Sequence, residues 1–155
     1  MLKEFGASNF ANTAYFNFEE NPSLKQFFET TKDTKRILQN LSLIQGTPIH
    51  PAGTLILFDE IQECPEALNT LKYFCENAPE YAIAGAGSLP GITYGKENSF
   101  PAGKVDFLNV HPLSFFEFLD GADPALSDFA KNIAAIETIP ELLFNHMLEK
   151  FRMTF

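Results

Sequence analysis

Apolar and alternating stretches along the chain predict four strands. The segment Thr54–Phe58 is almost wholly apolar, which is typical of a strand buried on both faces of a parallel sheet. Alternation and aromatic side chains predict an earlier strand at Thr13–Phe18. Two further short segments, Tyr81–Ala84 and Val105–Val110, are predicted to complete the set.

Helical spacing of apolar residues predicts helices between and after these strands. They are expected to begin near Asn21, Asp33, Pro65, Ser114, Asp123 and Thr138, and the last is expected to run to Phe155. Ser114 and Glu117 have the spacing of a capping box, and Gly46 follows the second helix as a stop signal. The alternation predicts an α/β fold with a mostly parallel sheet, helices on both faces and a helical C-terminal tail.

Length and charge narrow the class of protein. The 155 residues have an ordinary globular composition, and their net charge of −9 comes from acidic residues after position 50. An acidic surface repels phosphate backbones, so we expect no direct nucleic-acid binding by this segment. The apolar runs fall far short of the roughly 18 residues of a membrane span, and Met1–Gly6 has no signal-peptide pattern. We therefore expect a cytoplasmic protein without a membrane partner.

The cysteines and histidines do not have the spacing of a metal site. Cys64 and Cys75 form no CxxC pair, and the three histidines are far apart in the sequence. Cys75 falls on the apolar face of a predicted helix, so we expect it to be a buried structural thiol.

The pair Asp59-Glu60, directly after the buried strand, is the sharpest chemical feature. Ligands of parallel α/β sheets bind at the carboxyl ends of the strands, which is where this pair is expected. An aspartate there can hold the water shell of Mg²⁺, and a following glutamate can activate water for phosphoryl transfer. This pattern has the form of a Walker B element. The same pair also begins ordinary polar turns.

Ser88 follows the next predicted strand after the small residues Ala84 to Gly87. A hydroxyl at that point could sense a phosphate or the attacking water, and the alternative is an ordinary turn serine. The glycines here also resemble a nicotinamide-binding loop weakly. That chemistry requires a helix directly after the glycines, which Pro90, Gly91 and Pro101 oppose.

The chain contains no phosphate-binding loop of the form Gly-x-x-x-x-Gly-Lys-Ser/Thr. The nearest stretch, Gly91 to Glu97, is one residue short and ends in Glu, and Gly103-Lys104 precedes a predicted strand where the loop should follow one. We therefore expect phosphate binding by this chain to be weak.

Three stretches together resemble bacterial and archaeal AAA-type P-loop ATPases, which usually carry a C-terminal domain of unknown function. They are LILFDEIQECPEALNTLKYF (Leu55–Phe74), AGAGSL (Ala84–Leu89) and SFPAGKVDFLNVHPLSFFEFL (Ser99–Leu119). The resemblance extends from Met1 to about Phe151. It implies a fragment that begins just after the Walker A loop and ends before the C-terminal domain.

The resemblance also implies roles for four residues. Asp59 corresponds to the Mg²⁺-associated aspartate and Glu60 to the glutamate that activates water. Ser88 corresponds to a polar sensor residue. Lys104 lies where relatives carry Lys or Arg, which implies contact with the nucleotide, and a surface ion pair is the alternative.

The implied organisation is a truncated AAA-type ATPase core over residues 1–112 and a helical extension over 113–155. The implied cofactors are ATP and Mg²⁺, with ATP as the partner of the full-length relatives. Because the phosphate-binding loop is missing, we expect this chain to be inactive alone. The alternative is a non-catalytic protein-interaction module that keeps the ATPase-like fold, with an unknown protein partner.

Overall fold

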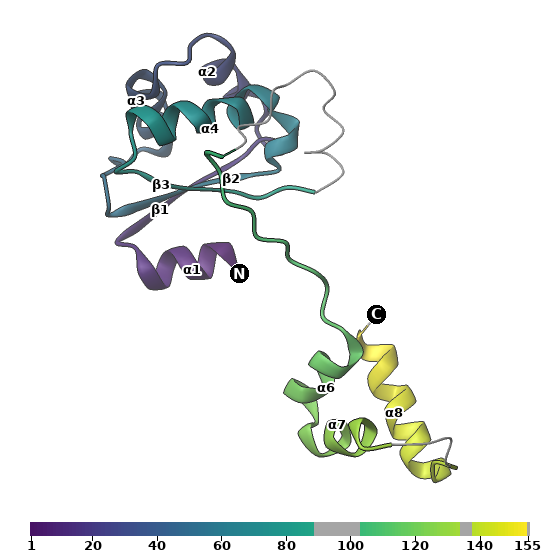
Figure 1. Cartoon of the computed structure of the whole chain (residues 1–155). Coiled ribbons are helices and arrows are strands. Elements are labelled where there is room, and N and C mark those ends of the chain that lie inside the picture. The colour runs from purple at the N-terminus through teal and green to yellow at the C-terminus, as the bar shows by residue number, and fades with distance from the viewer. Residues whose placement is uncertain (89–102, 134–137, 155) are drawn as a thin grey trace. The chain divides into compact units, whose positions relative to one another are not determined.

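The computed structural model describes residues 1–88, 103–133 and 138–154, and these form two compact units, Met1–Phe107 and Leu108–Phe155. The first unit contains a parallel sheet of three described strands in the order β1-β2-β3 (Figure 1). The strands are β1 (Asn12–Asn17), β2 (Thr54–Asp59) and β3 (Ala82–Gly85). The predicted α/β fold with a parallel sheet is thereby confirmed, and three of the four predicted strands lie within one residue of their expected bounds.

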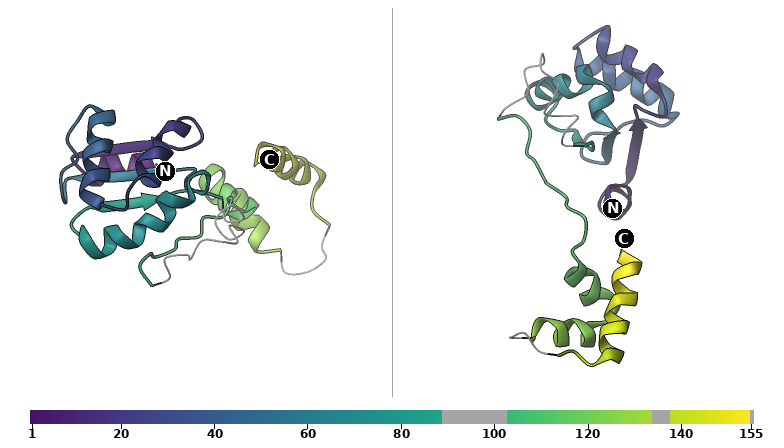
Figure 2. Two further views of the ribbon diagram at one scale, coloured as in Figure 1. Left: turned by 90° about the horizontal axis from the view of Figure 1, so that it is seen from above. Right: turned by 90° about the vertical axis from the view of Figure 1, so that its right-hand side faces the viewer.

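Helices cover both faces of this sheet, as the sequence predicts. Helix α1 (Leu2–Asn9) lies on one face, and α2 (Gln26–Glu29), α3 (Thr34–Gln45) and α4 (Pro65–Asn77) lie on the other (Figure 1, Figure 2). Two short 3₁₀ helices, η1 (Pro22–Lys25) and η2 (Ile61–Glu63), precede α2 and α4.

Strand β2 is buried on both faces because it lies between two strands and two helical layers. Ile56 and Phe58 belong to the main core beneath α3 and α4. Leu55 alternates with them on the α1 side, where a Cβ placed on Gly6 of α1 would lie 3.2 Å from its Cδ2. The continuous apolar run is thus the sequence signature of a central strand.

An aromatic cluster forms the centre of the main core. Phe58 of β2 contacts the rings of Phe16, Phe18 and Phe28, with centroid distances of 6.2, 5.7 and 5.4 Å. Phe18, Phe28 and Phe58 are each 0% exposed. Edge-to-face and tilted arrangements of this kind add to the stabilisation from burial.

Local capping signals set the helix bounds. The Asp33 carboxylate accepts a hydrogen bond from the backbone N–H of Lys35 at 2.9 Å, and α3 ends at Gly46, whose φ of +73° favours glycine. Pro65 is the first residue of α4.

The prediction of a strand at Val105–Val110 is wrong. These residues form no described helix or strand, and Leu108 and Val110 are 85% and 61% exposed. Apolar and β-branched residues favour a strand only where a neighbouring strand can pair with their backbone, and no described strand does so here. The long loop expected over Gly85–Gly103 lies mostly outside the described residues, as does the Gly91 to Glu97 stretch.

The prediction for the cysteines is wrong in its choice of residue. Cys75 is exposed, whereas Cys64, at the start of α4, is fully buried. Burial raises the pKa of the Cys64 thiol to about 11. The buried face of α4 is formed by Ala67, Thr70 and Phe74. Cys75 is adjacent to Phe74 but lies outside this buried face.

The second unit consists of α6 (Phe115–Ala122), α7 (Pro124–Lys131) and α8 (Glu141–Thr154), which confirms the helical tail. The capping box of α6 is present: the Ser114 N–H donates to Glu117 Oε2 at 2.8 Å, and the Glu117 N–H donates to Ser114 Oγ at 3.3 Å. The functional division into residues 1–112 and 113–155 stays a prediction. No helix among the described residues is long and apolar enough to span a membrane.

Candidate functional site

The carboxyl edge of the sheet carries the two acidic residues. Asp59 is the last residue of β2, and Glu60 follows it at the start of the turn into η2. The segment after β3 lies against this turn, because the Ala86 N–H donates to the Phe58 carbonyl at 2.7 Å and the Ile61 N–H donates to the Ala86 carbonyl at 3.0 Å. The ends of β2 and β3 therefore form one edge, which is where ligands of parallel α/β sheets bind.

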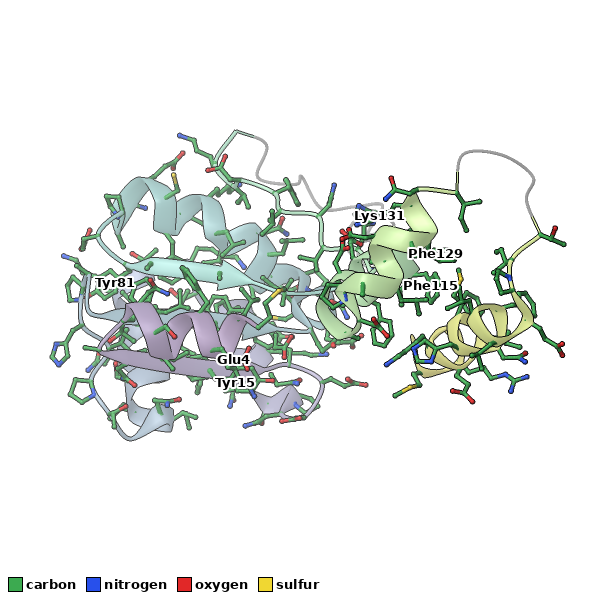
Figure 3. The ribbon with its side chains drawn as sticks, turned by 90° about the horizontal axis from the view of Figure 1, so that it is seen from below. Glu4, Tyr15, Tyr81, Phe115, Phe129 and Lys131 are labelled. Carbon is green, nitrogen blue, oxygen red and sulfur yellow. The ribbon has the colours of Figure 1, made fainter. Side chains whose placement is uncertain are left out.

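Asp59 is held by a tyrosine of the neighbouring strand. The Tyr15 hydroxyl donates to Asp59 Oδ2 at 2.6 Å, and Asn17 Nδ2 donates to the same hydroxyl oxygen at 3.3 Å. The Lys3 ammonium of α1 lies 3.4 Å from the centroid of the Tyr15 ring. Figure 3 shows Tyr15 on β1, on the side of the sheet that α1 covers. Tyr15 on β1 therefore contacts both Lys3 of α1 and the Asp59 carboxylate at the end of β2.

Glu60 has an unusual backbone conformation and its own hydrogen-bond partner. Its φ and ψ of 51° and 45° lie in the left-handed region, which costs a non-glycine residue of order 1–3 kcal/mol. Gln62 Nε2 donates to Glu60 Oε2 at 2.5 Å. Backbone strain of this kind often occurs at functional sites, because there the position of a side chain matters more than local stability.

The other two predicted site residues, Ser88 and Lys104, make no described contact with Asp59 or Glu60. Ser88 is exposed, three residues beyond the end of β3, and its contact with the carboxylates stays a prediction. Lys104 pairs with Glu76 at 3.4 Å, near the C-terminal end of α4. That end of α4 leads into the start of β3, at the edge opposite Asp59. The Lys104–Glu76 pair is the surface ion pair that the sequence offers as the alternative, and a contact of Lys104 with the nucleotide stays a prediction.

Sequence reasoning missed Tyr15 and Gln62. Tyr15 pairs with Leu57 in the parallel register, so a side chain that leans along the strand on the same face reaches Asp59, two residues further on. The alternation of β1 predicts which face of the strand carries Tyr15. Only the register between β1 and β2 shows that Asp59 lies within its reach. Gln62 lies two residues after Glu60, and the two side chains meet across the turn in which Glu60 is left-handed.

A family model described as AAA domain matches residues 1–119. The chain belongs to the AAA domain family. The match covers β1, β2 and β3 and extends to Leu119 in α6, so it contains both carboxylates of the carboxyl edge. No curated protein and no solved structure matches the chain.

AAA domains generally bind nucleotides, which raises the question of what this edge can hold. Asp59 and Glu60 offer the hard oxygen ligands that suit Mg²⁺, an ion that keeps several waters and needs few protein ligands. The described residues contain no cluster of three or more His, Cys, Asp or Glu that could enclose a metal ion. The residues therefore fit a hydrated Mg²⁺ held from one side. They do not fit a triphosphate by themselves, because the sequence lacks the glycine-rich loop and its lysine.

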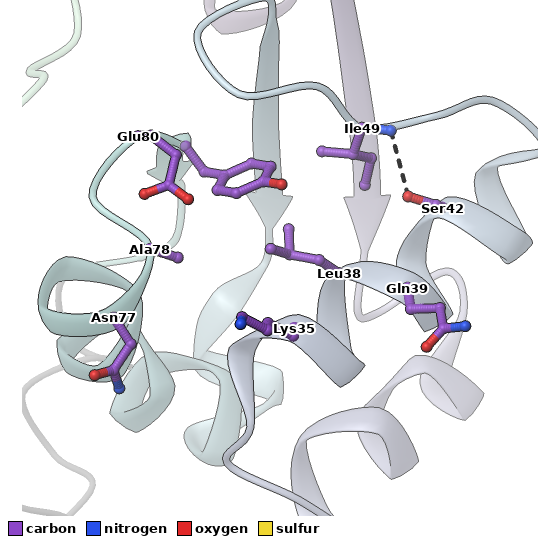
Figure 4. Close-up of a pocket in the computed structure, with 9 residues that line it drawn as sticks. Lys35, Leu38, Gln39, Ser42, Ile49, Asn77, Ala78 and Glu80 are labelled. Atoms are coloured by element: carbon purple, nitrogen blue, oxygen red, sulfur yellow. Dashed lines mark hydrogen bonds between the residues drawn. The ribbon is translucent and has the colours of Figure 1, made fainter.

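A cavity of about 350 Å³ elsewhere in this AAA domain lies between α3 and the end of α4 (Figure 4). It is lined by Lys35, Glu80 and Tyr81, among others, and lies near the start of β3. Because parallel strands begin at the edge opposite their ends, this cavity is separate from Asp59 and Glu60.

Replacing Tyr15 with Phe is expected to lower the free energy of unfolding by about 1–2 kcal/mol, because a hydrogen bond to a half-buried carboxylate is lost. Urea denaturation measures this change. Tyr81→Phe is the matched control, since the Tyr81 hydroxyl makes no hydrogen bond to another described residue, and it should change the unfolding midpoint little. The effect of Tyr15→Phe should largely vanish when Asp59 is Ala. An equal loss in both backgrounds would show that Tyr15 acts through packing alone.

Proposed function

We propose that this AAA domain supplies the metal- and water-directed carboxylates of an ATP-hydrolysing site, and that the phosphate-binding loop of that site comes from outside these 155 residues. The observation that supports the proposal is the pair Asp59 and Glu60 at the carboxyl edge of a buried parallel strand, in a chain that belongs to a nucleotide-binding family.

Each carboxylate has a separate role in this proposal. Asp59, held by Tyr15, would hold the water shell of Mg²⁺, and the ion would supply charge neutralisation at phosphate oxygens. Glu60 lies beside it and accepts the proton of the attacking water at its carboxylate. Ser88 is proposed as a polar sensor on the segment after β3. Lys104 has no part in this proposal, because it pairs with Glu76.

The purified 155-residue chain is expected to show no ATP turnover above a blank without protein, in the presence of Mg²⁺. The reason is the absence of the amide cradle and its lysine, without which two carboxylates repel a triphosphate. Glu60→Gln should make no difference to this result. Turnover that Glu60→Gln abolishes would place a phosphate site within these residues and overturn this part of the proposal.

A second arm of the same experiment tests the role of Glu60 directly. A variant extended ahead of Leu2 by a strand and a Gly-x-x-x-x-Gly-Lys-Thr loop should bind and hydrolyse ATP. Glu60→Gln in this variant should leave ATP binding intact and slow hydrolysis about 10²- to 10⁴-fold, which is the usual contribution of a general base. Equal hydrolysis with and without the substitution would contradict the assignment of Glu60.

The second candidate function is a non-catalytic interaction module. It is favoured by the apolar side chains that the second unit exposes, among them Leu108, Leu142 and Met153 at 85%, 81% and 71%. If the extended variant folds and binds no ATP, this candidate is preferred over the ATPase site.

A further inference from the structure

The segment after β3 reaches the side chain that holds Glu60. Backbone hydrogen bonds of Ala86 with Phe58 and Ile61 fix this segment against the turn after β2. As a result Gly87 lies directly against the Gln62 carboxamide. A Cβ placed on Gly87 would overlap Gln62 Oε1 and would lie 3.5 Å from its Cδ.

The orientation of the Gln62 carboxamide follows from its neighbours. Its Nε2 donates to Glu60 Oε2, and its Oε1 is buried without a hydrogen-bond partner in the described structure. Rotating the amide by half a turn would place Oε1 against the Glu60 carboxylate, oxygen against oxygen, and would break the bond. The bond to Glu60 therefore decides the orientation, at the cost of one unpaired acceptor beside Gly87.

We propose that Gln62 is the positioning residue of Glu60, and that Gly87 is required as glycine because it leaves the space that the Gln62 carboxamide occupies. The consequence for hydrolysis rests on the proposed function, in which Glu60 activates water. The contact itself is a property of the chain without nucleotide. Through it, the segment that carries Ser88 controls the orientation of Glu60 in the turn after β2.

The overlap at Gly87 has a specific consequence. Gln62 Oε1 is the far end of a flexible side chain, so a methyl group at position 87 displaces it at small cost to folding. Displacement removes Nε2 from Glu60. Gly87→Ala is therefore expected to release Glu60 while the sheet and the main core stay intact.

Nuclear magnetic resonance of the isotope-labelled 155-residue chain tests the proposal. The Gln62 Nε2 protons should show nuclear Overhauser contacts to the Glu60 Hγ protons. Gly87→Ala should abolish these contacts and shift the Glu60 side-chain resonances. Gly121→Ala is the matched control, because a Cβ at Gly121 meets nothing within 4 Å, and it should leave both unchanged.

A second variant keeps the test decisive if Gly87→Ala folds poorly. Gln62→Ala should shift the Glu60 resonances in the same direction, and Gly87→Ala added to it should produce no further shift, because the overlapping carboxamide is gone. Contacts that persist in Gly87→Ala, or shifts in the double variant equal to the sum of the single ones, would overturn the proposal. No nucleotide is present, so failure here leaves the hydrolysis experiment above as a separate test.

Discussion

Phe58→Ala is expected to lower the free energy of unfolding of the Met1–Phe107 unit by about 3–5 kcal/mol, the usual cost of removing a fully buried aromatic ring. Phe58 is 0% exposed, and its ring contacts three other phenylalanine rings. The cavity would lie among the remaining phenylalanine rings of the main core, and surrounding residues relax only partly into such a cavity. Since domains of this size are stable by only about 5–15 kcal/mol, the loss is a large fraction of the total free energy of unfolding and should lower the urea midpoint markedly.

Urea denaturation followed by circular dichroism measures this loss. Phe5→Ala is the comparison, because Phe5 is 52% exposed, and its cost should stay well below that of Phe58→Ala. Equal unfolding midpoints for Phe58→Ala and the parent chain would show that the aromatic cluster does not stabilise the first unit.

Gly6→Val is expected to have the second large effect, about 1–3 kcal/mol of destabilisation from overpacking between α1 and the sheet. A Cβ at Gly6 would overlap Thr13 Oγ1 and lie 3.1 Å from Thr13 Cγ2 and 3.2 Å from Leu55 Cδ2. The helix can then no longer approach β1 and β2 closely. Lys3 would leave the face of the Tyr15 ring, so the change also disturbs the residues around Asp59.

The same denaturation assay tests Gly6→Val, with two comparisons. Gly121→Ala lies inside α6 in open space and should stabilise its helix by about 0.5–1 kcal/mol, the opposite sign. Adding Thr13→Ala to Gly6→Val should recover part of the loss. Thr13 Oγ1 is buried and has no hydrogen-bond partner among the described atoms, so its removal breaks no bond. No recovery would mean that Thr13 is not the residue that limits the approach of α1.

Local features of the sequence determined the elements and several of their ends. The apolar run at Thr54–Phe58 predicts β2 because a strand buried on both faces needs no polar positions. Asp33, Gly46 and Ser114 predict helix ends because capping depends on residues within one turn of each other. The acidic pair after β2 is predicted in the same way, since the residue that follows a buried parallel strand must lie at the carboxyl edge.

Tertiary structure decided which side chains meet. Tyr15 reaches Asp59 across 44 positions of sequence only because β1 and β2 pair in one particular register. Gln62 and Gly87 meet because the backbone after β3 bonds to the turn after β2. Val105–Val110 has the composition of a strand, but a strand also needs a neighbouring strand to pair with. Cys75 is exposed because a different face of α4 packs against the core. The spacing of residues along the chain predicts local hydrogen bonds and the alternation of strands, whereas the pairing of strands and the packing of side chains depend on residues that are distant in sequence.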